Sequence, residues 1–559
     1  MSESAIERFP QPAPGHRDWY TFEAIRALPR IILMVDKNPF SETYGCFDRE
    51  YWHYRTIDFP CGMSQEFCLA LALAFKHPFP NNPYYGNQRL RELVVGSIEF
   101  ANKSAHADGS CDDYFPFERA LGALVFSLYA MTESYLVLGL SRPDLVEFFR
   151  RRASWLCKHN ESGQLANHQA LAALALYNVY LLTGDETFRK ASDDYRDITL
   201  SWQNEEGWFQ EYEGADPGYH SCSIAFLAKL WQKSHDEQIV APIGRAIEFA
   251  SYFMHPDGSY AGEYGSRNTY HFYPHGFEVF ADRFPLAGRI AQTYLQRGLP
   301  ERRRYYNDDN RMCAHYVYDW MQAWLDWQGT ARDGTLEQHR RPFTQWFPNA
   351  KILVKKTASY YAVMSLAKGG VIKVYDDAGP LYSDTGPIAK TASGDVLVSH
   401  MVDDNPIEAD PAAGRFSTRG HLTKRKHQLA SPIKQAAFRA MNLTLGRYNP
   451  NLVRTTLQKI LITGKPRADI TFGRRVEFTD TEINIHDSLD GSGGDTKLTR
   501  LAIGSDATSI YVANSTNFQE SMLMPWTEQA ESVEVFNAER KVDLPVRTVS
   551  RAKLGKPLG

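Results

Sequence analysis

The pattern of apolar and polar residues changes once along the chain. In residues 64–327, apolar residues recur at three- and four-residue spacing, as in 117–138 and 167–182, which predicts amphipathic helices. Segments such as SRPD (141–144) and TGDE (183–186) lie between these stretches and supply residues that end one helix and cap the next. Roughly ten helices fit this part, and the short loops between them favour antiparallel neighbours.

Beyond Pro348 the period becomes that of β-strands. Residues 351–377 and 468–489 alternate β-branched or aromatic residues with polar ones and break at turn residues. This alternation predicts antiparallel strands with one face toward water. The polar stretch 403–420 (DDNPIEADPAAGRFSTRG) predicts a long loop.

A polar, glycine-containing stretch at residues 327–342 predicts a linker between the two parts. We therefore expect a multidomain α and β protein, with a helical domain over residues 1–335 and an antiparallel β domain over residues 345–559. Helical hairpins in succession can curve into an incomplete barrel, an α/α toroid, whose inner helices line a cleft. The β domain can then form one wall of that cleft.

Composition narrows the class of protein. With 559 residues the chain is long enough for two domains, and a net charge of −4 argues against a generally basic nucleic-acid-binding protein. No apolar run is long enough to predict a membrane span, so we expect neither a nucleic acid nor a membrane as partner. Residues 1–20 show no secretory signal, which predicts a cytoplasmic protein, or a secreted or periplasmic one if a signal was removed. The seven cysteines show no CxxC spacing and predict free thiols.

Several motifs of known chemistry are absent from the sequence. It contains no GxGxxG or Walker loop, no HExxH and no GxSxG, so nucleotide hydrolysis and serine esterase chemistry have no support. No cofactor is predicted. Asp384, His400, His421 and His427 are scattered through the β part without diagnostic spacing, which leaves room for a divalent metal there, although the pattern favours surface histidines.

Two polar segments stand where helices are expected to begin. Asn167 and His168 precede an apolar helical run, where free backbone N–H groups and the helix dipole favour an anion. Tyr219 follows the turn-forming Pro217-Gly218 pair in the segment 214–221. Its phenol can serve as a general acid or base if neighbouring groups tune it. An N-capping Asn with an incidental His, and a packing tyrosine, are the structural alternatives.

A third segment, residues 263–278, is unusually dense in polar and aromatic residues for a loop before a helix. Its candidates are Arg267, Asn268, His271, Tyr273, His275 and Glu278. The guanidinium fork of Arg267 matches a carboxylate.

Two further segments, 58–66 and 108–119, combine a Pro or Gly with acidic residues before a helix. Asp112, Asp113 and Glu118 could bind sugar hydroxyls or act as carboxylate catalysts, and helix capping explains them nearly as well. The inner helices of a toroid would direct all of these loops to one opening. Asn, His, Tyr and Arg side chains would then surround one anionic ligand.

The order of NHQA, then DPGY, then GSRNT leading to PHGFE, followed by a β domain, resembles the heparinase II/III-like polysaccharide lyases. Related alginate and chondroitin lyases combine an α/α toroid with an antiparallel β-sandwich. The resemblance implies cleavage of uronic-acid-containing glycans by β-elimination. In that reaction the C6 carboxylate is neutralised, a base removes the C5 proton, and an acid protonates the departing O4.

The resemblance also implies roles for individual residues. Asn167 would bind the uronate carboxylate, assisted by Arg267 or Asn268. His168 would neutralise that carboxylate or act as the C5 base. Tyr219 would be the general acid and could also be the base, and His275 is a second candidate for stabilising charge. The remaining expected substrate-binding residues are Glu278, Asp112, Asp113 and Glu118. The family's second tyrosine, in the β domain, has four candidates: Tyr360, Tyr361, Tyr375 and Tyr382.

Other functions remain open at this level. One is an inverting glycoside hydrolase on the same scaffold, with Asp113 paired with Glu206 or Glu263 at roughly 6.5–9.5 Å. Others are a C5 epimerase and a glycan-binding protein without turnover. The expected partner is an anionic polysaccharide or oligosaccharide. The polymer, the endo or exo mode and the oligomeric state are not determined by the sequence.

Overall fold

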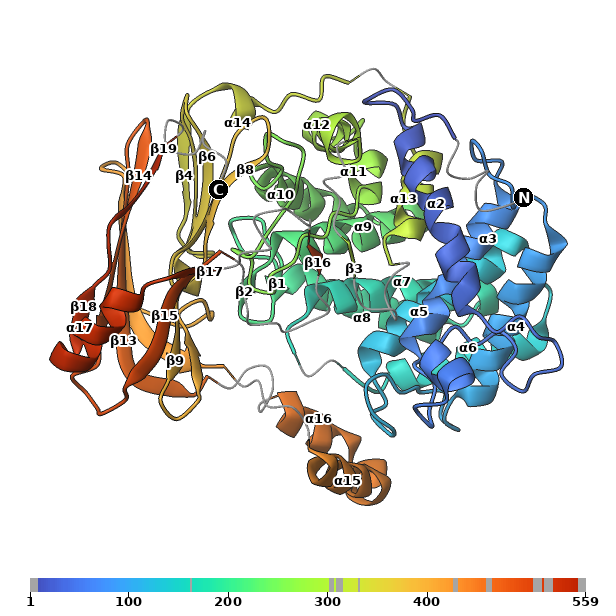
Figure 1. Cartoon of the computed structure of the whole chain (residues 1–559). Coiled ribbons are helices and arrows are strands. Elements are labelled where there is room, and N and C mark those ends of the chain that lie inside the picture. Colours follow the sequence, from blue (N-terminus) through green and yellow to red (C-terminus); the bar gives the residue numbers. More distant parts are fainter. Residues whose placement is uncertain are drawn as a thin grey trace.

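The computed structural model describes residues 9–160, 163–300, 306–307, 315–329, 332–425, 431–458, 465–505, 515–516 and 526–550. Helices dominate the first part of the chain and antiparallel strands the second. Figure 1 shows the helices, blue to green, beside the strands, yellow to red.

The helical half has an inner and an outer layer. The inner helices are α3 (Cys68–Lys76), α5 (Leu121–Leu138), α7 (Ala166–Thr183), α9 (Pro217–Ser234), α11 (His275–Val279) and α13 (Val317–Leu325). The outer helices are α2 (Asp18–Met34), α4 (Gln88–Ser104), α6 (Pro143–Leu156), α8 (Glu186–Ser201), α10 (Val240–Ser251) and α12 (Pro285–Thr293). Short turns and pairs accompany them: η1 (Glu50–Tyr54), η2 (Met63–Phe67), η3 (Glu237–Ile239), η4 (Tyr294–Gly298), β1 (Gln210–Glu211) and β2 (Gly214–Ala215).

Packing and sequence pattern explain the two layers. Each inner helix contacts the next along the chain, and α13 contacts α3, so the ring of inner helices closes. Helices α5, α7 and α9 are apolar on most sides and almost wholly buried, as inner helices must be. Helices α4, α6, α8 and α10 each bury one face. The α/α toroid predicted from the sequence is confirmed, and its inner ring is closed.

Two expectations about the helical half can be compared with the structure. Among the described cysteines, Cys46, Cys61, Cys68, Cys111, Cys157 and Cys222 are free thiols, and Cys313 lies outside the described residues. Within the described chain, α5 is the one helix long and apolar enough to cross a membrane, contrary to the expectation of no such run. Since 78% of that window is buried inside the protein, α5 serves as a core helix.

The second half contains two antiparallel sheets in its described residues. The first sheet has the order β4 (Phe343–Phe347), β5 (Ile352–Lys356), β6 (Tyr361–Ser365), β7 (Val371–Tyr375) and β8 (Pro380–Asp384). The second comprises β9 (Gly386–Thr391), β10 (Val396–Val398), β11 (Ile407–Asp410), β12 (Arg415–Lys424), β13 (Arg467–Phe478), β14 (Glu482–Asp490), β15 (Leu498–Gly504), β17 (Trp526–Glu528), β18 (Lys541–Asp543) and β19 (Arg547–Ser550). Further elements are α14 (Glu337–Arg340), η5 (Leu366–Lys368), α17 (Ala530–Glu539), and the pair β3 (Tyr306–Asn307) and β16 (Ser515–Thr516).

The first sheet is buried on both faces. One face contributes Leu353, Met364 and Ile372 to a core shared with strands of the second sheet. The opposite face contributes Val354 and Val363 to the core of the toroid. The period of two along each strand therefore divides its side chains between the two cores, and the first sheet joins the toroid to the second sheet.

The prediction of a long loop at residues 403–420 is wrong. Strand β11 pairs with β12 there, from Ile407 opposite Thr418 to Asp410 opposite Arg415. The Pro, Gly and Asp residues that suggested a loop form the turn and the ends of this hairpin. The connection from β12 to β13 contains helices that the sequence did not predict: α15 (Pro432–Met441), η6 (Asn442–Gly446) and α16 (Pro450–Gln458).

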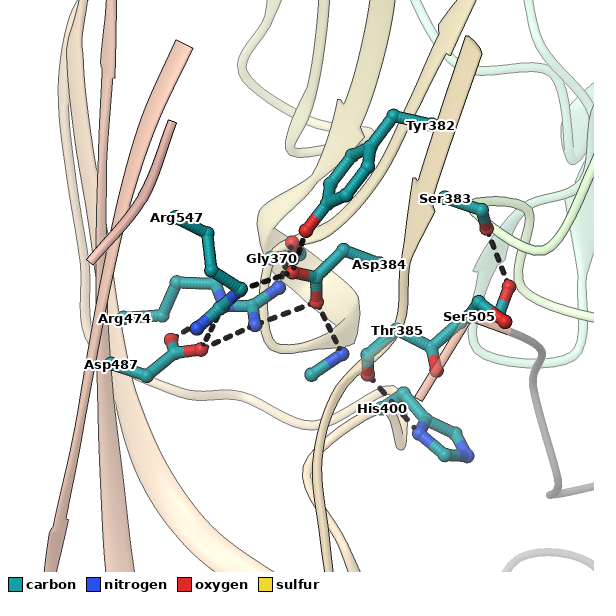
Figure 2. Close-up of polar contacts among 11 residues, drawn as sticks. Gly370, Tyr382, Ser383, Asp384, Thr385, His400, Arg474, Asp487, Ser505 and Arg547 are labelled. Atoms are coloured by element: carbon teal, nitrogen blue, oxygen red, sulfur yellow. Dashed lines mark hydrogen bonds and ion pairs between the residues drawn. The ribbon is translucent and has the colours of Figure 1, made fainter. Parts of the chain in front are cut away.

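A buried ionic cluster connects the two sheets (Figure 2). Arg474 on β13 bonds Asp384 on β8 at 2.8 Å and Asp487 on β14 at 2.7 Å. Arg547 on β19 bonds the second oxygen of Asp384 at 3.0 Å. Each carboxylate is thus neutralised by a guanidinium at the depth of the core, where an unpaired charge would be costly.

Candidate active site

Asp216 links the two most distinctive motifs of the toroid. It precedes α9, where its Oδ1 accepts from the backbone N–H of Tyr219 at 2.9 Å and so caps the helix. Its Oδ2 accepts from the backbone N–H of Arg267 at 2.8 Å, and Thr269 Oγ1 donates to Oδ1. One carboxylate therefore fixes the start of α9 against the GSRNT segment.

Two glycines permit this close approach. A Cβ on Gly218 would collide with Thr269 Oγ1 and lie 3.2 Å from the backbone nitrogen of His271. A Cβ on Gly265 would lie 2.6 Å from Asp216 Oδ2. The DPGY and GSRNT motifs are therefore two halves of one packed junction.

Beside this junction, the buried carboxylate of Glu211 is held by several donors. Asn167 donates its backbone N–H to Oε1 at 3.0 Å and its Nδ2 to both carboxylate oxygens, at 2.7 and 2.9 Å. Arg267 Nη1 donates to Oε2 at 2.9 Å. Burial raises the pKa of Glu211, while Arg267 and Asn167 oppose that rise. The start of α7 thus binds a carboxylate as the sequence predicts of a helix start, but that carboxylate belongs to the protein itself.

Tyr219 lies against Arg267. The guanidinium carbon is 3.7 Å from the centre of the Tyr219 ring, and the His271 ring meets the same ring edge-on at 4.9 Å. Burial raises the pKa of Tyr219, and Arg267 opposes that rise. Burial, aided by His315 and Arg267, lowers the pKa of His271 well below its usual value. At neutral pH the site therefore holds a protonated phenol beside a neutral imidazole.

His168 is the partly exposed member of this group. Its ring meets Phe126 edge-on at 5.9 Å, and a Cβ on Gly122 would lie 2.9 Å from its Cε1. Its positive form would lower the pKa of Glu211. The structure thus groups Asn167, His168, Tyr219 and Arg267, which the sequence singled out separately.

His315 is a member of the site that the sequence analysis missed. Its Nδ1 lies 3.1 Å from Glu66 Oε1, and its ring centre is 4.4 Å from that of Phe126. Its Nε2 is buried and has no hydrogen-bond partner among the described residues. His315 lies two residues before the first residue of α13, and Asn167 and His168 lie in the first turn of α7. A histidine at the start of an inner helix was the available signal.

The β half holds the GSRNT segment from the other side. Lys368, at the end of η5, donates to the backbone oxygens of Glu263 and Gly265, the latter at 2.9 Å, and to Asn268 Oδ1. Lys373 on β7 pairs with the Glu263 carboxylate at 2.5 Å. Burial lowers the pKa of Lys368 to about 7. Asn268, expected to assist in substrate binding, is therefore bonded to this lysine.

His275 and Glu278, in α11, belong to other contacts. His275 Nε2 lies 2.6 Å from Asp326 Oδ2, and its backbone N–H donates to Asp319. Glu278 accepts from Tyr20 at 2.9 Å and from Arg332 at 2.5 Å. Within the described residues, no hydrogen bond or ring contact joins either residue to Tyr219 or Arg267.

The acidic candidates of the 108–119 segment fold that loop. Asp112 accepts from the backbone of Phe117 at 2.8 Å, and Glu118 accepts from Tyr114 at 2.7 Å. Asp113 lies 3.1 Å from Cys61 Sγ. Asp112 and Glu118 therefore bond the backbone of their own loop and do not cap α5, whose N-cap, Ala120, makes no side-chain hydrogen bond, so the capping alternative is wrong.

The scattered metal candidates of the β half have other contacts. Asp384 is held by two guanidiniums, His400 Nδ1 lies 3.2 Å from Thr385 O (Figure 2), and His421 Nδ1 lies 3.0 Å from Ala468 O. His427 lies outside the described residues. Within the described residues no group of three or more His, Cys, Asp or Glu could hold a metal ion.

The four tyrosines considered for the β domain are also bonded or stacked. Tyr360 donates to Thr479 O, Tyr361 to Tyr252 O at 2.6 Å and Tyr382 to Asp384 at 2.9 Å, and Tyr375 stacks on His255 at 3.9 Å. None of these contacts joins the β-domain tyrosines to Tyr219, and a second catalytic tyrosine is not assigned.

No family model and no curated protein matches the sequence. Among solved structures, the chain resembles the Streptomyces coelicolor A3 chondroitin AC lyase in complex with chondroitin sulphate, with a TM-score of 0.52 and 10% identity over 90% of this chain and 71% of that one. Heparinase III matches with a TM-score of 0.48, 10% identity and coverages of 87% and 76%. The heparan sulfate lyase HepC mutant of Pedobacter heparinus matches with a TM-score of 0.41 and 11% identity, over 89% of this chain and 71% of that one. The Streptomyces match shows that this chain has the fold of that lyase, a helical toroid followed by antiparallel sheets.

Proposed function

We propose that this protein is a polysaccharide lyase that cleaves uronic-acid-containing glycans by β-elimination. The observation that carries the proposal is the buried junction at Asp216, where the guanidinium of Arg267 lies over the phenol ring of Tyr219. The likeness in fold to a chondroitin lyase supports the same class of reaction.

In the proposed reaction Tyr219 is the general acid. Its raised pKa keeps the phenol protonated at neutral pH, so it can give its proton to the departing glycosidic O4. Arg267 then stabilises the phenolate that forms, because its positive charge lies over the ring. Tyr219 regains a proton when the product leaves.

The C5 proton needs a base, and the residues around Tyr219 offer three. His168 and Tyr219 are the candidates from the sequence, but Tyr219 is protonated at neutral pH and would have to lose its proton before it could act as the base. His271 is the candidate that the structure adds, since it is neutral at neutral pH and its ring contacts Tyr219. The base takes the C5 proton, the C5 electron pair forms the C4–C5 double bond, and the C4–O4 bond breaks.

The uronate carboxylate has to be neutralised for C5 to become acidic. The partial exposure of His168 supports this role for its side chain. Both Nδ2 hydrogen bonds of Asn167 go to Glu211, so Asn167 can bind a uronate only if Glu211 releases it. In the proposed ground state, Asn167 therefore positions Glu211 and, through it, Arg267.

The first test is ultraviolet absorbance during incubation with glucuronans, alginates and glycosaminoglycans. Elimination leaves a conjugated 4,5-unsaturated uronate that absorbs, whereas hydrolysis does not. Rising absorbance with a member of the panel supports the lyase. New reducing ends without absorbance would instead favour hydrolysis. The contacts of Glu206 argue against it as the partner of Asp113 in a hydrolase, because its carboxylate accepts hydrogen bonds from the backbone N–H groups of Asn349 at 2.7 Å and Ala350 at 3.0 Å.

A further inference from the structure

The connection between β12 and β13 is a helical excursion from an otherwise regular antiparallel pair. Thr423 on β12 lies opposite Arg467 on β13, so the chain leaves the sheet and returns to the same place. Between them lie α15, η6 and α16, which together make residues 431–458, here called the basic hairpin. Figure 1 shows it, in orange, projecting at the lower edge of the molecule.

The composition of this connection differs from that of the whole chain. Residues 425–466 contain no Asp or Glu, whereas the full chain has 66 acidic and 62 basic residues. The basic residues of the connection are Arg425, Lys426, Lys434, Arg439, Arg447, Arg454, Lys459 and Lys465. Such a run of one sign attracts an anionic partner.

The basic hairpin also exposes large apolar side chains. The exposed fraction lies between 48% and 84% for each of five residues: Ile433, Leu443, Leu445, Tyr448 and Leu452. Helix α15 has no buried residue. Isolated exposed leucines are ordinary on protein surfaces, but this concentration within twenty residues is typical of a surface that binds something apolar.

The toroid holds the hairpin from one side. The Phe438 ring meets Phe115 edge-on at 5.5 Å, and Arg439 pairs with Asp58. The Arg447 guanidinium lies 5.4 Å from the centre of the Phe117 ring. These contacts fix the hairpin on the body of the protein while the five apolar side chains remain exposed.

We propose that the basic hairpin binds the surface of a membrane that contains anionic phospholipids. Apolar side chains would enter the boundary between headgroups and acyl chains, and Lys and Arg would neutralise lipid phosphates. A polyanionic glycan would satisfy the basic residues but leave the leucines against water, so charge and apolarity together favour lipid. This binding is independent of the proposed catalysis, and it differs from the expectation from composition that no membrane is a partner.

The test is flotation of the full chain with phosphatidylcholine vesicles, with and without phosphatidylglycerol. We expect binding only to the anionic vesicles, weakened by high salt. The Leu445→Ser/Leu452→Ser variant should bind about tenfold more weakly because it loses apolar area that enters the bilayer. Phe40→Ser/Val546→Ser removes exposed apolar side chains elsewhere on the surface and should leave vesicle binding unchanged.

Three outcomes would overturn the proposal. The first is no binding to anionic vesicles by a protein with a normal thermal unfolding transition. The second is heparin binding as tight as vesicle binding, with both unaffected by Leu445→Ser/Leu452→Ser, which would indicate a surface for polyanions in general. The third is a concentration-dependent dimer that this variant abolishes, which would indicate a second copy of the chain as the partner.

Discussion

At the scale of single residues, the candidate site depends on two buried carboxylates, Asp216 and Glu211. Asp216 accepts hydrogen bonds from the backbone N–H groups of Tyr219 and Arg267. Glu211 accepts hydrogen bonds from the side chains of Asn167 and Arg267. Both are fully buried. These two carboxylates fix the positions of the Tyr219 phenol and the Arg267 guanidinium relative to each other. Such positioning raises the reactivity of a site without any additional reactive group.

Replacing Tyr219 by Phe should abolish elimination while glycan binding persists. The variant removes only the proton donor, and loss of a general acid costs about 10²–10⁴-fold in turnover. Turnover is measured by ultraviolet absorbance and binding by calorimetry. Tyr212→Phe is the matched control, because Tyr212 also lies beside Arg267, at 5.0 Å, yet has no proposed proton transfer. Equal turnover in wild type and Tyr219→Phe would remove Tyr219 as the acid.

Lys368 should make stability depend on pH. Burial lowers its pKa to about 7 in the folded protein, against about 10.4 when unfolded. Between these values the unfolded chain binds more protons, so the free energy of unfolding should rise as pH rises from about 7 toward 10. Lys368→Met lacks this group and should show a shallower rise in denaturant titrations across that window. Parallel curves for the two proteins would contradict the assignment.

Residue-level prediction from the sequence found the motifs but not their connection. Tyr219, Arg267 and Asn167 were identifiable because helix starts and turn residues are local features. Glu211 was not, because it sits in a two-residue strand whose importance depends on a partner 44 residues away. The same limit explains Asn268, whose contact with Lys368 crosses between the two halves of the chain.

At the scale of elements, Gly218 is the position where two segments come closest. A Cβ there meets Thr269, so Gly218→Ala should push the GSRNT segment away from α9 and separate Arg267 from Tyr219. A displacement of about 1 Å can cost about 10²-fold in turnover. We expect that loss with the far-ultraviolet spectrum unchanged. Gly493→Ala, where the added Cβ meets only Asp469 O at 3.7 Å, should behave like wild type. Wild-type activity in Gly218→Ala would mean that the junction adapts.

The elements that the sequence predicted are those with long, mostly apolar helical stretches or a regular alternation of apolar and polar residues. Helices α5 and α7 and strands β13 and β14 bury regular sets of residues, and each was expected. Helix α15 was missed although Ile433, Ala437 and Met441 recur at four-residue spacing, and in the structure it buries no residue. Its local signals, a Ser431 cap and Pro432 in the first turn, are also present in the sequence. In residues 403–420, the turn-forming residues led to the prediction of a loop where the structure has a short hairpin.

At the scale of the whole molecule, the first sheet packs against both halves and so connects them. One face belongs to the core of the toroid and the other to the core between the sheets. Lys368 and Lys373, just before and on β7, hold the GSRNT segment. The candidate site in the toroid is therefore supported by the β half, and the stability of that half should affect it.

The cluster around Arg474 is where that stability can be tested. Arg474 and Arg547 lower the pKa of Asp384 although burial would raise it, so the carboxylate stabilises the fold when ionised. Asp384→Asn should cost about 3–5 kcal/mol in the free energy of unfolding near neutral pH, because it leaves buried guanidiniums underpaired. The contribution of a group with a lowered pKa is lost as pH falls, so the gap between wild type and variant should narrow below about pH 4. Denaturant unfolding of both proteins at several pH values measures this gap. A gap that stays constant with pH would mean that packing around Asp384, and not its charge, connects the two sheets.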